Sequence, residues 1–146
     1  MKIRVKFIDK EVYPDGLMKI GGNRSDWIDL RARDNVYMKK GELKYIPLGV
    51  AIELPKGYEA LVVPRSSTPK NFSVLEANSI GIIDESYCGD NDEWCFPAYA
   101  IENTLINKGD RICQFRIIEH QPELEFEVVE SLNNANRGGI GSSGIA

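Results

Sequence analysis

The 146-residue sequence has few of the side chains on which many enzymes and metal sites depend. Its single histidine, His120, disfavours a histidine base and a histidine-rich metal site. Its three cysteines (Cys88, Cys95 and Cys113) are an odd number without a CxxC pair, so we expect reduced thiols rather than disulfides or zinc ligands. Apolar runs of the roughly 20 residues needed for a membrane helix are missing, as is an N-terminal apolar signal core. We therefore expect a cytoplasmic protein without a membrane partner.

Positive charge is also in short supply. Lysine and arginine total 18 against 22 aspartates and glutamates, which gives a net charge of −4. An acidic chain lacks the basic surface of a general nucleic-acid binder, so any anionic ligand must be held by local groups. The hydrophobic content of 42% and the length are those of one soluble globular domain.

Hydrophobic residues recur mostly with the two-residue period of strands. Residues 2–8, 27–32 and 124–128 alternate apolar and polar side chains, and shorter β-like runs cover residues 35–38, 48–54, 58–63, 80–83 and 111–118. Turns rich in glycine, proline and aspartate separate these runs, which predicts an all-β sandwich, jelly roll or barrel. Residues 66–72 offer a serine or threonine cap followed by proline, so a short helix is expected there.

The C-terminal residues 133–146 have a different composition, rich in glycine, asparagine and serine. We therefore predict a body over residues 1–132 and a flexible arm over residues 133–146. Such a segment is either a frayed tail or an arm that covers a phosphate, because glycines let backbone N–H groups approach an anion closely.

Five short patches carry the residues suited to chemistry. In chain order they are DLRA (29–32), PRSS (64–67), GIIDESYCGD (81–90), GDRICQ (109–114) and RGGIGSSG (137–144). Arg65 beside serine hydroxyls favours an anion site, although an ordinary helix cap has the same sequence. Asp84 at the end of an apolar strand is suited to orient a water, and Tyr87 to pack on a sugar, although a hairpin with a polar turn is the simpler alternative.

Together, in this order, the five patches resemble the motifs of the homotrimeric dUTPase family, in the variant found in Gram-positive bacteria and their phages. The resemblance covers nearly the whole chain. It implies an all-β, jelly-roll-like barrel with one short helix, assembled as a homotrimer whose active sites are each shared between three chains. It also implies Mg²⁺-dependent hydrolysis of dUTP to dUMP and pyrophosphate, which limits uracil in DNA and supplies dUMP for thymidylate synthesis.

The resemblance also assigns roles to individual residues. Asp84 would activate the water that attacks the α-phosphorus, and Tyr87 would leave no room for a 2′-hydroxyl. Mg²⁺ would be held mainly by the substrate phosphates, with Asp29 contributing at most through a bound water. The remaining substrate-binding residues implied by the family are Asn78, Gly81 and Ile83 for uracil, Arg65, Ser66, Ser67 and Gln114 for the phosphates, and Arg137, Gly139, Ser142 and Ser143 in the arm.

Some features leave alternatives open. Ile140 occupies the place where the family has a phenylalanine that stacks on uracil, so Trp94 is either a substitute lid or a core or interface residue. A dCTP deaminase of the same fold is a second candidate, and a dUTP-sensing regulatory module with a protein partner is a third. Ammonia release would identify the deaminase, and binding without turnover would identify the sensor.

Overall fold

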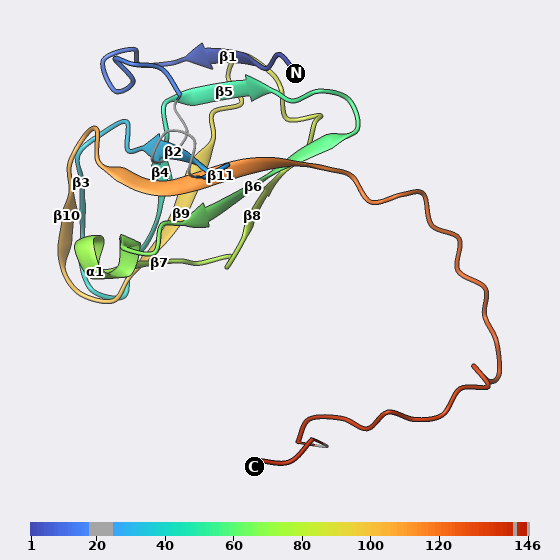
Figure 1. Cartoon of the computed structure of the whole chain (residues 1–146). Helices are drawn as coiled ribbons and strands as arrows, with labels where there is room; N and C mark the ends of the chain where they lie inside the picture. The colour runs from blue at the N-terminus through green and yellow to red at the C-terminus, as the bar shows by residue number, and fades with distance from the viewer. Residues whose placement is uncertain (18–24, 142, 146) are drawn as a thin grey trace.

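The computed structural model describes residues 1–17, 25–141 and 143–145 (Figure 1). In these residues the chain forms eleven short strands and one short helix. The elements are β1 (Arg4–Phe7), β2 (Ile28–Arg31), β3 (Val36–Met38), β4 (Leu43–Pro47), β5 (Val50–Glu53), β6 (Tyr58–Pro64), α1 (Thr68–Phe72), β7 (Val74–Glu76), β8 (Gly81–Ile83), β9 (Cys95–Ala100), β10 (Thr104–Ile106) and β11 (Arg111–Glu119). Among the described residues, no helix is long and apolar enough to cross a membrane.

All the strand pairs are antiparallel. The largest sheet has the order β2-β11-β6-β8, and a second sheet has the order β4-β9-β7. The pairs β1-β5 and β10-β3 complete the body. This arrangement confirms the all-β prediction, and it places β8 at an edge of the largest sheet.

The core lies between these sheets and is built from their inward-facing apolar side chains. Trp94 is fully buried, and its ring meets that of Phe115 edge-on with centroids 5.2 Å apart. Ile46, Leu48 and Phe96 are also fully buried. Of the two alternatives for Trp94, the core role is therefore the one that the structure shows.

The short helix begins one residue after its cap, Ser67, and is fixed by the next side chain. The Thr68 hydroxyl is completely buried; it accepts a hydrogen bond from the Arg65 N–H and donates one to the Ile112 carbonyl, each 2.8 Å long. The predicted helix is confirmed, and Thr68 ties the turn before it to β11. This determines where the Arg65 side chain leaves the backbone.

One predicted strand is wrong. Residues 124–128 form no strand and are exposed, because the chain runs away from the body after β11 and none of the described strands lies beside it (Figure 1). Four strands were not predicted: β7 and β10 are only three residues long, and β4 and β9 each contain a proline, which weakens a strand signal.

Candidate active site

A pocket of about 580 Å³ lies beside β8 and the loop that follows it. Five of the predicted site residues line it, which come from the turn before β8, from β8 itself and from the loop after it. They are Asn78, Gly81, Ile83, Asp84 and Tyr87. The rest of the lining includes apolar side chains from β4, β6 and β9, so the pocket combines an apolar wall with a few polar groups, as small-molecule sites do.

The backbone of β8 is suited to read a planar ring with hydrogen-bonding edges. Among the described strands, β8 pairs with β6 alone, so half of its backbone polar groups point away from the sheet. A Cβ atom at Gly81 would lie 3.2 Å from the Val62 Cβ and 3.3 Å from the Glu76 Oε1, which is tighter than ordinary contact. Glycine at position 81 therefore lets β8 lie this close to its partner strand β6 and to Glu76 of β7.

Glu76, at the end of β7, is a buried acid that the sequence pattern did not distinguish. Glu76 is 8% exposed, and neither carboxylate oxygen has a hydrogen bond of good geometry among the described residues. Burial raises the pKa of Glu76 to about 7, and the nearby Gly81 N–H offsets only part of this shift. Nothing in the sequence around Glu76 distinguishes it from an ordinary solvated acid on a strand.

Asp84 follows β8 directly and lies at the mouth of the pocket. Hydrogen bonds from Ser86, including one of 2.8 Å from its N–H to the Asp84 Oδ1, lower the pKa of this carboxyl below its ordinary value. Asp84 is therefore ionised at neutral pH and able to accept a proton from water.

A second polar cluster lies at the far end of β6. The Arg65 Nε is 2.9 Å from the Asp29 Oδ1, and the Arg111 Nη1 is 3.4 Å from the Asp29 Oδ2. The Gln114 side-chain amide donates a 3.1 Å hydrogen bond to the Pro64 carbonyl. Ser66 beside them is exposed and Ser67 half-buried. The cluster presents two guanidinium groups and a hydroxyl, which is chemistry suited to a phosphate.

Asp84 and this cluster are well separated in one chain. Ile83 pairs with Ala60, which places Asp84 beside Glu59, whereas Arg65 follows the last residue of β6. A strand rises by about 3.3 Å per residue, so the six residues from Glu59 to Arg65 span roughly 20 Å. Within one chain, the predicted site residues of the body therefore lie in two separate groups rather than in one.

The remaining predicted residues lie in the C-terminal arm. Arg137, Gly139 and Ser143 are exposed, and the C-terminal segment that carries them runs away from the body (Figure 1). Ser142 lies outside the described residues. In the part of the chain that the structure describes, no three histidine, cysteine, aspartate or glutamate side chains are placed so that they could hold a metal ion together. The three cysteines are free thiols, as expected.

A comparison with protein families gives one match: the model of dUTPase covers residues 22–144, which include all five motifs. The chain belongs to the dUTPase family. It is 56% identical over 144 residues to the SPbeta prophage-derived deoxyuridine 5′-triphosphate nucleotidohydrolase YosS of Bacillus subtilis, covering 99% of both chains.

Solved dUTPases share the fold at lower sequence identity. A point mutant of the Staphylococcus bacteriophage 80alpha dUTPase, solved with dUpNHpp, is 20% identical, has a TM-score of 0.75 and is matched over 99% of both chains. A point mutant of the dUTPase from phage phi11 of S. aureus, with a structural Mg(II) ion, is 17% identical and has a TM-score of 0.74 over 92% of this chain and 100% of that one. These matches confirm the predicted jelly-roll fold of the dUTPases.

Proposed function

We propose that this chain hydrolyses dUTP to dUMP and pyrophosphate and that the pocket beside β8 binds the deoxyuridine. The observation that carries the proposal is the convergence of Asn78, Gly81, Ile83, Asp84 and Tyr87 on one pocket in a member of the dUTPase family. The same residues would be needed to bind a pyrimidine nucleotide and to present a water to its α-phosphorus.

Selection of the base rests on the edge of β8. Backbone N–H and C=O groups there, with the Asn78 amide, complement the acceptor and donor edge of uracil. Cytosine presents the reverse pattern and would leave buried polar groups unpaired, a mismatch that can reduce kcat/KM by roughly 10⁴-fold. The close packing under Gly81 holds the strand in place, and Tyr87 packs against the sugar.

The reaction is an attack of water on the α-phosphorus. The water oxygen forms the new P–O bond while its proton passes to the Asp84 carboxylate, and the bond from the α-phosphorus to the α–β bridging oxygen breaks. Pyrophosphate leaves with that oxygen, and Arg65, Ser66, Ser67 and Gln114 stabilise the phosphate charge. Arg137, Gly139, Ser142 and Ser143 of the arm close over the end of the phosphate chain.

Mg²⁺ fits this site as an ion carried by the substrate. The described residues offer no protein cage, and the Asp29 carboxylate is already paired with two guanidinium groups. Mg²⁺ would be held mainly by the substrate phosphates, with Asp29 contributing at most through a bound water, and it would supply positive charge that offsets the charge of the leaving group.

The separation of the two clusters supports a homotrimer with shared sites. The α-phosphorus and the bridging oxygen are bonded to each other, so Asp84 and Ser66 of one chain, about 20 Å apart along β6, do not reach the same nucleotide. The sheet β4-β9-β7 also exposes an apolar row in which Leu43 pairs with Tyr99 and Tyr99 with Leu75. An exposed row of this kind suits contact with another copy of the chain.

Two further features fit the proposal. Free thiols are typical of a reducing compartment, and we place the enzyme in the cytoplasm. The arm over residues 133–146 lies at the end of the segment that leaves the body after β11, and it reaches a site on a neighbouring chain.

The test is pyrophosphate release from dUTP, dCTP, dTTP and UTP with Mg²⁺, together with the mass of the assembled protein in solution. Release from dUTP alone by a trimer is expected. Ammonia from dCTP would support a deaminase instead. Tight dUTP binding without pyrophosphate would support the sensor, and a catalytically active monomer would refute the shared site.

A further inference from the structure

The orientation of Tyr87 depends on a residue six positions later in the same loop. The Tyr87 hydroxyl donates a 3.1 Å hydrogen bond to the backbone carbonyl of Glu93. The Tyr87 residue is 41% exposed, so packing alone does not hold its ring. Its N–H donates to the Asp84 carbonyl at 3.0 Å, which ties the start of the loop to the end of β8.

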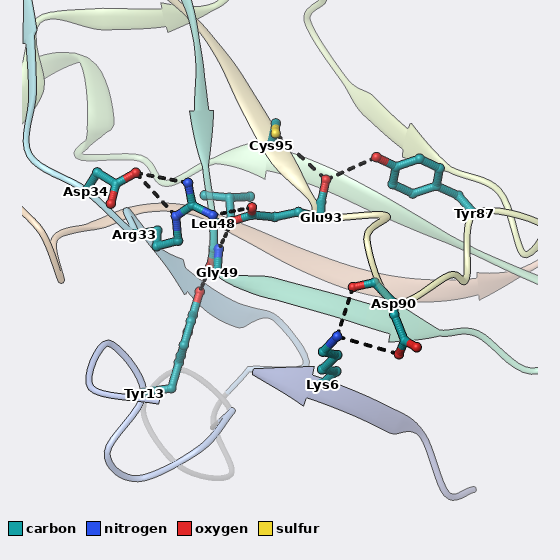
Figure 2. A network of polar contacts seen from close by, with 10 residues as sticks. All are labelled: Lys6, Tyr13, Arg33, Asp34, Leu48, Gly49, Tyr87, Asp90, Glu93 and Cys95. Carbon is teal, nitrogen blue, oxygen red and sulfur yellow. Dashed lines mark hydrogen bonds and ion pairs between the residues drawn. The ribbon is translucent and has the colours of Figure 1, made fainter. Parts of the chain in front are cut away.

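Glu93 is fixed in turn by its side chain, as Figure 2 shows. One carboxylate oxygen accepts a 2.6 Å bond from the Arg33 Nη1, and the other accepts a 2.8 Å bond from the Gly49 N–H. The Glu93 side chain is 16% exposed, so both bonds are shielded from water. Charge-assisted bonds in such surroundings are strong and directional. The loop is thereby attached to two segments that lie outside the pocket.

We propose that the Arg33–Glu93 ion pair is a positioning device for Tyr87 and thereby helps the pocket select 2′-deoxyribose over ribose. The inference rests on the proposed function, because it assigns Tyr87 to the sugar. With the pair intact, the Glu93 carbonyl holds the phenol in place against the sugar. Without it, the carbonyl shifts, the exposed ring loses its hydrogen bond to that carbonyl, and space for a 2′-hydroxyl opens.

Asp34 provides a control for the Arg33–Glu93 pair. Arg33 also contacts Asp34, with its Nη2 3.2 Å from the Asp34 Oδ2, but that carboxylate is 54% exposed and does not contact Glu93 in the described chain. Exposed pairs contribute little. Removing the Asp34 charge therefore tests the loss of an Arg33 contact without disturbing Glu93.

The experiment compares dissociation constants of dUMP and UMP, and kcat and KM for dUTP and UTP, in wild type, Arg33→Ala, Glu93→Ala and Asp34→Asn. We expect the first two variants to lower the deoxy-over-ribo preference by about 10- to 100-fold, in binding and in kcat/KM alike. KM for dUTP should rise while kcat stays within about threefold, because Asp84 is untouched. Asp34→Asn should leave the preference within about twofold.

Combination with Tyr87→Phe distinguishes positioning from a general structural effect. Tyr87→Phe already lacks the hydroxyl, so adding Arg33→Ala should cost no further preference. Glu93→Gln keeps one acceptor oxygen and replaces the other with an NH₂ donor, so it should recover only part of the loss seen in Glu93→Ala, and it serves if Arg33→Ala fails to fold. Unchanged preference in Arg33→Ala and Glu93→Ala, or additive losses with Tyr87→Phe, would overturn the inference. If wild type does not turn over dUTP the proposed function fails, and the dUMP and UMP constants still decide the inference.

Discussion

The pocket beside β8 and the C-terminal arm differ in how much of their geometry one chain determines. In the pocket, each predicted residue is placed by a strand pair, a buried side chain or a hydrogen bond, from Gly81 packed on Val62 to Tyr87 held by the Glu93 carbonyl. The arm has exposed residues, glycines and no strand partner in the described chain. Under the proposed function, the preformed surface of the pocket selects the base and the sugar. The arm closes over the phosphates and becomes ordered only when it binds them.

The largest effect is expected from breaking the pocket side at Asp84. Asp84→Asn removes the proton acceptor and retains the size of the side chain, so kcat for dUTP should fall by about 10³-fold or more. Affinity for dUMP should remain within severalfold, as titration calorimetry would show. Asp90→Asn, which alters an exposed acid of the same loop, is the matched control. Equal losses in both variants would remove Asp84 from its assigned role.

Breaking the arm side should have the next largest effect. A chain ending at Leu132 lacks the residues assigned to closure, so kcat/KM for dUTP should fall by about 10²-fold. The described arm residues form no strand with the body, so the thermal unfolding temperature should stay nearly constant. Calorimetry and steady-state kinetics measure the two quantities. A large drop in unfolding temperature would mean that the arm supports the fold as well as the site.

Glu76 gives a further test of the pocket, because burial of its carboxyl next to Gly81 makes the free energy of unfolding depend on pH. The folded chain binds the Glu76 proton more tightly than the unfolded chain, so the free energy of unfolding falls as pH rises from about 4.5 to about 7. The loss is on the order of 3 kcal/mol at pH 8 relative to pH below 4.5. Glu76→Gln should remove this decline and raise stability at pH 8, whereas the exposed Glu125→Gln should not. Urea unfolding at pH 5.5 and pH 8, at one protein concentration, measures it.

The smallest effect concerns the pKa of the proposed base. Hydrogen bonds from Ser86 lower the pKa of Asp84, and activity needs the ionised form, so Ser86→Ala should raise that pKa. The acid limb of the kcat profile should then shift to higher pH, while kcat at pH 8 changes by less than about threefold. An unchanged acid limb would mean that another group controls it.

Much of the fold could be predicted from local pattern, and the failures have physical reasons. The alternation in residues 2–8 and 27–32 and the β-like run over residues 111–118 predict strands, and the structure forms β1, β2 and β11 there. Residues 124–128 alternate just as well, yet they form no strand, because a strand also needs a neighbour that local sequence does not supply.

The sequence pattern predicted candidate site residues whose own side chains are suited to chemistry. It did not predict residues whose role is to hold another residue in place. Asp84, Tyr87 and Arg65 stand out by type and position, whereas Glu93 has its effect through a carbonyl and Thr68 through the Arg65 N–H. Such roles depend on contacts between distant segments, such as Arg33 with Glu93, 60 positions apart. Side-chain burial, which separates Glu76 from other acids, is likewise a property of the folded chain.

The distance of about 20 Å along β6 between Asp84 and the Arg65 cluster has a genetic consequence. In the shared site as proposed, Asp84 and Arg65 come from different chains. A chain without Asp84 and a chain without Arg65 are therefore defective in different parts of the site. In a mixed assembly, some sites take the pocket from the second chain and the phosphate cluster from the first, and these sites are whole. Two inactive alleles expressed together would therefore complement each other.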